Sequence, residues 1–191
     1  MWYYEKKLEY PICIRRCDLK MAKVLAAQLG GPNGELAASL RYMSQRYIMP
    51  TGKTKGLLTD IATEELAHVE MISTMMYQLM EGATPAQLQE AGLAGYYTQN
   101  GRSIYTADAN GVPFTAAYFA SMDDPVTNLY ENMAAEQKAR TTYEHLMNQT
   151  DDPDLLDPLK FLRQTEVIHF QRFGEALNDV NFLRDSKRIY G

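Results

Sequence analysis

Residues 61–72 read Ile-Ala-Thr-Glu-Glu-Leu-Ala-His-Val-Glu-Met-Ile. Apolar side chains recur here at i, i+3 and i+4, which is the spacing of one face of an α-helix. The members of this apolar stripe are Ile61, Ala62, Leu66, Val69 and Ile72. Glu65 and His68 are three residues apart within the same segment, so a carboxylate and an imidazole share one helix face. Such a pair can reach a single metal ion.

The same pairing returns near the C-terminus, where a second glutamate precedes a second histidine by three residues. A further glutamate lies thirty residues before each of the two pairs. The six residues form two triads displaced by 101 positions: Glu35, Glu65 and His68, and then Glu136, Glu166 and His169. Glutamate accounts for only 13 of the 191 residues, so a repeat of this kind is rarely a coincidence.

Helix geometry explains the interval of thirty residues. From Glu35 a helix climbs about 14 residues, or roughly 21 Å, to the breaker Pro50-Thr51-Gly52. A second helix then returns over about 13 residues to Glu65, at the same height. The segment from Glu136 to Glu166 repeats this arrangement around a turn near residues 150–153. Two such hairpins bring four glutamates and two histidines to one level inside a four-helix bundle.

Cap and breaker residues predict where each element begins and ends. The expected main helices cover about residues 33–48, 53–80, 123–149 and 157–180, and a short extra helix covers 19–29. Residues 81–122 are rich in glycine and aromatic residues and show no convincing helix, so we expect a long crossover there. Two tight hairpins joined by one crossover predict an all-α, ferritin-like four-helix bundle. We expect one domain over residues 1–191, with a partly free tail from Asn181.

The apolar surroundings of Glu65 and Glu166 predict that both carboxylates are buried. Buried carboxylates are costly unless they are paired or bound to metal. Four glutamates balance the charge of two divalent cations, so the pattern favours a two-metal site. The less favoured alternative is a set of surface glutamates beside two histidines of the core.

Other polar residues near these segments are assigned to the solvated surface. Glu131 and His145 lie on other sides of their helix than Glu136. Glu64 lies four residues before His68 and reaches the same turn, but it too is assigned to solvent. Tyr42 lies seven residues after Glu35 and so points the same way. Its hydroxyl can donate a hydrogen bond to a ligand, but filling of the core is an equally good interpretation.

Several segments resemble the non-haem manganese catalases. These segments are residues 30–35, 63–72 and 109–114, Ala134-Ala135-Glu136, and Glu166 to His169. The resemblance covers nearly the whole chain and extends to the short CotJC-type members, which are spore coat proteins of endospore-forming bacteria. It implies that Glu65 bridges two manganese ions. It also implies that Glu35 and His68 complete one ion, and that Glu136 and His169 complete the other. By the same resemblance, Glu166 is a proton acceptor rather than a ligand.

The resemblance implies disproportionation of hydrogen peroxide to water and dioxygen. Two alternatives stay open. One is a structural spore coat protein with little catalysis, and the other is a diiron oxidase or iron store of the ferritin-like kind. Glutamate and histidine suit iron and manganese alike, so the ligand types do not separate these metals.

We expect the chain to form a homo-oligomer, and the resemblance implies a hexamer and other spore coat proteins as partners. The argument from the residues is that the crossover aromatics and the methionines at 71, 75, 76 and 80 exceed what one small bundle can cover. Packing inside the chain is the alternative interpretation of the methionine stripe.

Composition excludes several classes of partner. The formal net charge is −5, and there are no clusters of lysine or arginine, which argues against binding to nucleic acid or anionic membranes. No run of 18 apolar residues is present, so we expect no membrane span. The N-terminus lacks an apolar segment after a basic one, so we expect cytoplasmic synthesis without a signal peptide, and incorporation into the spore coat.

Overall fold

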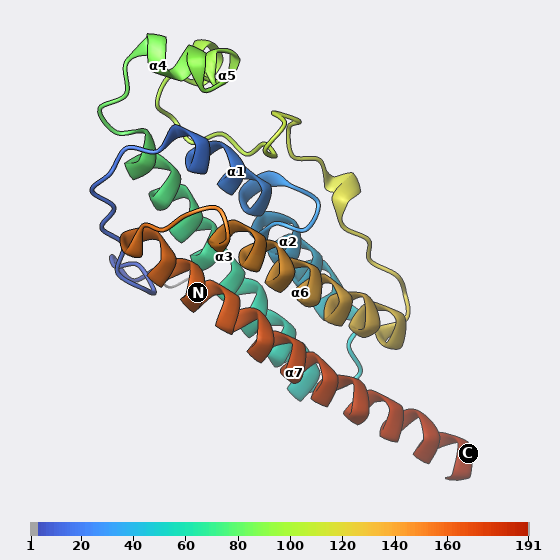
Figure 1. Cartoon of the computed structure of the whole chain (residues 1–191). Helices are drawn as coiled ribbons and strands as arrows, with labels where there is room; N and C mark the ends of the chain where they lie inside the picture. Colours follow the sequence, from blue (N-terminus) through green and yellow to red (C-terminus); the bar gives the residue numbers. More distant parts are fainter. Residues whose placement is uncertain (1–3, 191) are drawn as a thin grey trace.

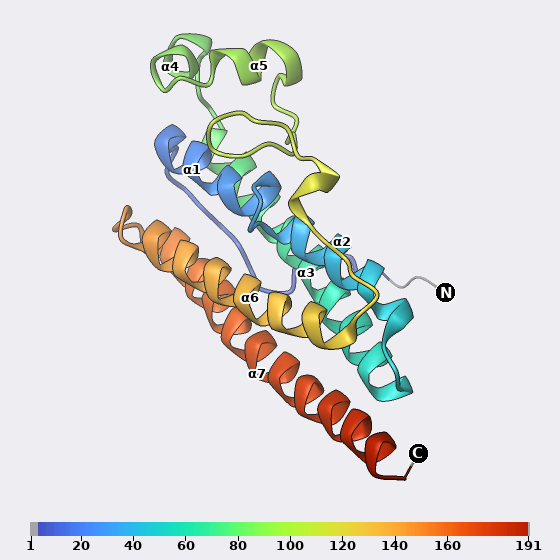
Figure 2. The same cartoon turned by 90° about the vertical axis from the view of Figure 1, so that its right-hand side faces the viewer.

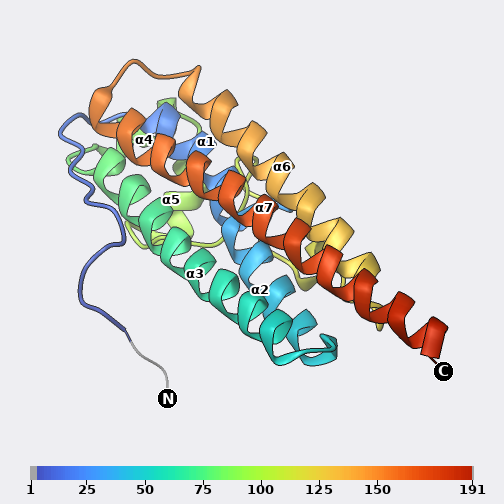
Figure 3. The same ribbon diagram turned by 90° about the horizontal axis from the view of Figure 1, so that it is seen from below.

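The computed structural model describes residues 4–190, with side chains described as far as residue 186. Residues 1–3 and Gly191, the last residue of the predicted free tail, lie outside this part. Four long helices run side by side: α2 (Glu35–Gln45), α3 (Gly52–Met80), α6 (Pro125–Met147) and α7 (Pro153–Tyr190) (Figure 1). The tightest packing joins α2 with α3 and α6 with α7, as Figure 3 shows from below. The predicted all-α bundle of two hairpins is confirmed.

The predicted short extra helix is present as α1 (Leu19–Gly30), and it packs on α3. The turn after α2 begins with the 3-10 helix η1 (Arg46–Ile48). Among the described residues, no helix combines the length and apolar character that a bilayer crossing requires.

Polar side chains set the start of α3 and of α6. Thr51 accepts a hydrogen bond from the Thr54 backbone N–H at the start of α3, and the Thr54 hydroxyl completes a capping box. Asp124 accepts from the N–H groups of Val126 and Thr127 at the start of α6. Pro125 follows in the first turn, where its missing N–H costs nothing.

The crossover between α3 and α6 is not free of helix, so that prediction was wrong. It contains α4 (Pro85–Glu90), α5 (Ala94–Asn100) and the 3-10 helix η2 (Ala116–Tyr118). Thr84 and Gln87 form a capping box around Pro85, which starts α4. Helices of one or two turns are too short to show a 3.6-residue period, so only their caps signal them. Figure 2 shows the crossover passing over α1 and α2 before it joins α6.

The last helix is longer at both ends than the predicted 157–180. It begins at Pro153, after Asp152 accepts a hydrogen bond from the Asp154 N–H, and it contains Pro158 in its second turn. It continues to Tyr190 because residues 181–190 hold neither proline nor glycine. In Figure 1 the end of α7 projects past the other helices.

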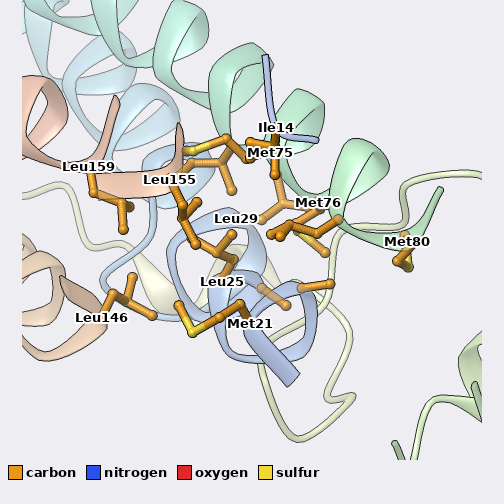
Figure 4. Close-up of a cluster of buried hydrophobic side chains, with 14 of the residues drawn as sticks. Ile14, Met21, Leu25, Leu29, Met75, Met76, Met80, Leu146, Leu155 and Leu159 are labelled. Carbon is orange, nitrogen blue, oxygen red and sulfur yellow. The ribbon is translucent and has the colours of Figure 1, made fainter. Parts of the chain in front are cut away.

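Two apolar clusters fill the bundle at different heights. The first gathers buried residues of α1, the C-terminal half of α3 and the α6–α7 turn, as Figure 4 shows. It includes the methionine stripe, which is buried: Met71, Met75, Met76 and Met80. The prediction that this stripe needs a second subunit to cover it was therefore wrong, because α1 covers it. The second cluster lies toward the other end and includes Tyr42, Leu58 and Phe173. On α3, α6 and α7 the polar triad residues fall between the two clusters.

Candidate metal centre

All six residues of the two triads come together in the centre of the bundle. Glu35 lies on α2, Glu65 and His68 on α3, Glu136 on α6, and Glu166 and His169 on α7. None is more than 1% exposed. Their oxygen and nitrogen atoms form two overlapping groups, in each of which all atoms lie within 4.8 Å of one another. The first group is Glu35, Glu65, His68 and Glu166, and the second is Glu65, Glu136, Glu166 and His169.

Glu65 lies between the two imidazoles. Its Oε2 is 2.8 Å from His68 Nδ1, and its Oε1 is 2.8 Å from His169 Nδ1. The two imidazole rings are stacked, with centroids 5.8 Å apart. A carboxylate that offers one oxygen to each side is arranged as a bridge between two ions would be. Glu166 also belongs to both groups, so the geometry leaves open whether it is a ligand or a base.

The outer nitrogen of each imidazole faces another carboxylate. His169 Nε2 is 3.1 Å from Glu64 Oε2, and His68 Nε2 is 3.7 Å from Glu9 Oε2. A carboxylate in this position holds the imidazole in the tautomer that presents its other nitrogen to a metal. The prediction that Glu64 is merely solvated was wrong, because its partner lies across the bundle on α7. His145 is exposed, as predicted.

Two buried tyrosines donate hydrogen bonds to Glu35 on α2 and to Glu136 on α6. The hydroxyl of Tyr42 donates a hydrogen bond to Glu136, and the hydroxyl of Tyr143 donates one to Glu35. Each tyrosine lies seven residues after one glutamate and bonds the other, so the two contacts cross between the hairpins. The sequence reasoning missed Tyr143, although Tyr42 and Tyr143 are also 101 positions apart. Extending the repeat to the position of Tyr42 would have found it. No pattern in the sequence, in contrast, indicates that Glu9 lies near His68.

Burial and mutual repulsion control the charges of the centre. Burial, together with the neighbouring Glu65, raises the pKa of Glu35 well above its ordinary value. Burial, with Glu35 and Glu136, does the same to the pKa of Glu166. Burial also disfavours the charged forms of Glu65 and the histidines, but their mutual attraction outweighs it. The pKa of Glu65 is therefore lowered, that of His68 is raised to about 10, and that of His169 is raised as well.

The donor set fits a pair of divalent cations. Two buried carboxylate oxygens that face the centre, Glu136 Oε2 and Glu166 Oε1, have no hydrogen-bond partner among the described residues. Glu65 Oε1 and His169 Nδ1 lie 2.8 Å apart but are not hydrogen-bonded to each other. Unpartnered buried polar atoms are rare in folded proteins unless something binds them. Carboxylate oxygen and imidazole nitrogen are ligands for manganese, iron and zinc. Four carboxylates would also neutralise two divalent ions.

Comparisons with known proteins agree with this geometry. Residues 1–187 match the protein family described as manganese containing catalase. The chain is 52% identical over 190 residues to protein CotJC of Bacillus subtilis (strain 168), covering 100% of both chains. It is 32% identical to a probable manganese catalase of Clostridium acetobutylicum, covering 94% of this chain and 81% of the relative.

Solved structures give the same result. The crystal structure of KatB, a manganese catalase from Anabaena PCC7120, matches with a TM-score of 0.87 and 30% identity, over 95% of this chain and 81% of KatB. A dodecameric thioferritin from Bacteroides fragilis shares the fold, with a TM-score of 0.61 and 19% identity. The family match over residues 1–187 and the full-length relatives lead to one conclusion. This chain belongs to the manganese-containing catalase family.

Proposed function

We propose that this protein disproportionates hydrogen peroxide to water and dioxygen at a pair of manganese ions, as a component of the bacterial spore coat. The observation that carries the proposal is the convergence of six buried side chains on one polar layer between two apolar clusters. Membership of the manganese catalase family supports the metal and the reaction. The coat location rests on the resemblance to CotJC, at 52% identity over the whole chain.

In this proposal five residues bind metal. Glu35 and His68 hold one ion, Glu136 and His169 hold the other, and Glu65 bridges them. The tyrosine hydroxyls of Tyr42 and Tyr143 orient the two terminal carboxylates. The apolar clusters above and below keep bulk water away, which strengthens each electrostatic contact.

Proton transfer is assigned to Glu166. Oxidation of one peroxide to dioxygen releases two protons and two electrons, and reduction of another to two waters consumes the same number. The manganese pair supplies the two-electron exchange when it is bound. Glu166 Oε1, which has no hydrogen-bond partner among the described residues, accepts a proton from peroxide and returns it. Burial raises the pKa of Glu166, so its carboxylate is a stronger base than an exposed one.

The test separates the base from a ligand. Glu166→Gln keeps the size and removes the titrating group, so metal content should stay near two per chain. Oxygen release should fall by about 10²- to 10⁴-fold, the usual effect of losing a general acid or base. Glu65→Gln should instead lose metal, because a bridging carboxylate neutralises both ions. His145→Gln is the control, since His145 is exposed and should change neither quantity.

The opposite pattern, with metal lost in Glu166→Gln and kept in Glu65→Gln, would contradict these roles. It would favour the ligand arrangement of a diiron protein. Metal analysis of protein produced with both iron and manganese supplied distinguishes the manganese enzyme from an iron oxidase or store. If the wild-type protein is fully loaded with manganese and releases no oxygen from peroxide, the proposed catalase activity is wrong.

A structural role in the coat is the second candidate. Five tyrosines are between 42% and 75% exposed: Tyr4, Tyr47, Tyr77, Tyr105 and Tyr130. Exposed tyrosines suit packing interfaces or oxidative cross-links between coat proteins. We also propose assembly into a homo-oligomer, a hexamer by the family resemblance. Sedimentation at micromolar concentration should then show a species larger than 21.7 kDa.

A further inference from the structure

A small cavity reaches the centre from the start of α2. One face of α2 lines it, together with residues of α6 and α7. Its lining includes Gly34, Ala38, Arg41, Ala135, Glu136 and Glu166. Its volume of about 10 Å³ open to water-sized molecules is the space that one water needs. The two glutamates at its inner end each have one oxygen without a hydrogen-bond partner among the described residues.

Small side chains leave this space open between α2 and α6. Ala38 on α2 faces Ala135 and Ala139 on α6, and all three line the cavity. Any larger side chain at these positions would fill it. The space that remains is that of one water-sized molecule.

Arg41 is the one basic residue of the cavity lining. Its side chain is buried, with 3% exposure. One guanidinium nitrogen, Nη2, donates a hydrogen bond to the carbonyl of Tyr118 on the crossover. Its Nε has no partner, and no carboxylate of the described residues lies within ion-pair distance. A buried cation without a paired anion is unusual, because burial of an unpaired charge is costly.

We propose that Arg41 binds one oxygen of peroxide in this cavity and stabilises the hydroperoxide anion that forms when a proton passes to Glu166. The inference rests on the function proposed above. In this step one O–H bond of hydrogen peroxide breaks and one forms on Glu166 Oε1, so the products are the hydroperoxide anion and a neutral carboxylic acid. No electron moves in this step.

Charge balance explains why an anion would collect here. Four carboxylates and two divalent ions sum to zero, and Arg41 then leaves a net positive charge beside the cavity. The further carboxylates near the centre, those of Glu9 and Glu64, face the outer nitrogens of the two imidazoles. Neither lines the cavity. By this count the loaded centre is most positive on the side where the cavity lies.

The test uses the metal-loaded protein and fluoride, a water-sized monovalent anion that does not turn over. Calorimetric titration with sodium fluoride measures the dissociation constant directly. Arg41→Gln should weaken fluoride binding on the order of 10- to 100-fold, the effect of losing a hydrogen bond to a charged group. Arg41→Lys should recover most of it. The KM for peroxide should rise in Arg41→Gln more than kcat falls, with metal content unchanged.

The matched control is Gln45→Met. Gln45 also holds the crossover, through a hydrogen bond from its Nε2 to the carbonyl of Ala120, but it does not line the cavity. If Arg41 acts only by holding the crossover, Gln45→Met should weaken fluoride binding as much as Arg41→Gln, and the proposal is overturned. Equal fluoride affinity in Arg41→Gln and wild type also overturns the proposal. If Arg41→Gln then releases oxygen at the wild-type rate, the proposed catalase activity still stands. If Arg41→Gln binds fluoride more weakly than wild type but the wild type releases no oxygen from peroxide, the anion site is supported and the catalase activity is rejected.

Discussion

At the scale of single residues, two tyrosine hydroxyls form hydrogen bonds between α2 and α6 that the spacing along one helix does not predict. Tyr143 on α6 donates to Glu35 on α2, and Tyr42 on α2 donates to Glu136 on α6. Each helix therefore supplies one carboxylate and the donor for the opposite carboxylate. The donors orient both carboxylates in the metal-free chain.

Removal of one hydroxyl tests this contact. In Tyr143→Phe, Glu35 loses its donor inside a buried site, so the free energy of unfolding of the metal-free protein should fall by about 1–3 kcal/mol. Metal affinity, measured by competition with a chelator, should fall roughly 10- to 100-fold.

Tyr130→Phe is the control on the same helix, because Tyr130 is 59% exposed. It should change the free energy of unfolding by no more than about 0.5 kcal/mol. Equal effects of the two substitutions would mean that the Tyr143 hydroxyl does not support Glu35.

At the scale of elements, the crossover depends on a close approach to the end of α1. A Cβ atom added at Gly30 would lie 2.6 Å from the backbone nitrogen of Ala107. Because the obstructing atoms belong to the backbone, they cannot move aside as a flexible side chain would. The last turn of α1 and the crossover can therefore touch only if residue 30 has no side chain.

Gly30→Ala should accordingly lower the free energy of unfolding by about 1–3 kcal/mol, the cost of overpacking. Gly56→Ala is the control, since a Cβ at Gly56 in α3 meets nothing within 4 Å. That change should stabilise the protein by roughly 0.5–1 kcal/mol, because alanine is the better helix former. Urea unfolding of both variants measures the two free energies of unfolding. A Gly30→Ala variant as stable as wild type would show that the crossover backbone near Ala107 can move aside.

At the scale of the whole molecule, the buried polar layer between two apolar clusters makes stability depend on pH. The pKa of His68 is about 10 in the folded, metal-free chain, against 6.5 without its partners, and that of His169 moves in the same direction. This stabilisation is complete below pH 6.5 and is lost as pH rises toward 10. The raised pKa values of Glu35 and Glu166 act in the same sense, because the folded chain holds their protons more tightly.

Metal-free protein should therefore become less stable between pH 6.5 and 9, as measured by urea unfolding. The manganese-loaded protein should not follow this slope, because metal replaces the protons and binds deprotonated ligands better as pH rises. A double variant, His68→Gln with His169→Gln, should lose the part of the slope that the histidines contribute in the metal-free state, while Glu35 and Glu166 keep theirs. If metal-free protein has the same free energy of unfolding at pH 6.5 and at pH 9, the histidines are not stabilised by the neighbouring carboxylates as described.

Much of this molecule follows from local rules that act along one helix. The period of 3.6 residues places Glu65 beside His68, and Glu166 beside His169, whatever surrounds them. The rise of 1.5 Å per residue, with a breaker halfway between Glu35 and Glu65, sets their common height. The bundle and the convergence of six residues could thus be predicted, whereas their roles as ligands and base stay predictions.

Tertiary packing decided the rest, because it depends on how each helix is rotated and what crosses it. Glu64 was assigned to solvent from its own helix, yet it meets His169 on another. Glu9 reaches His68 from a segment without regular structure, and Arg41 borders the cavity only because α6 presents alanines there. Local spacing specifies which residues share a face, but only the assembled bundle specifies what that face touches.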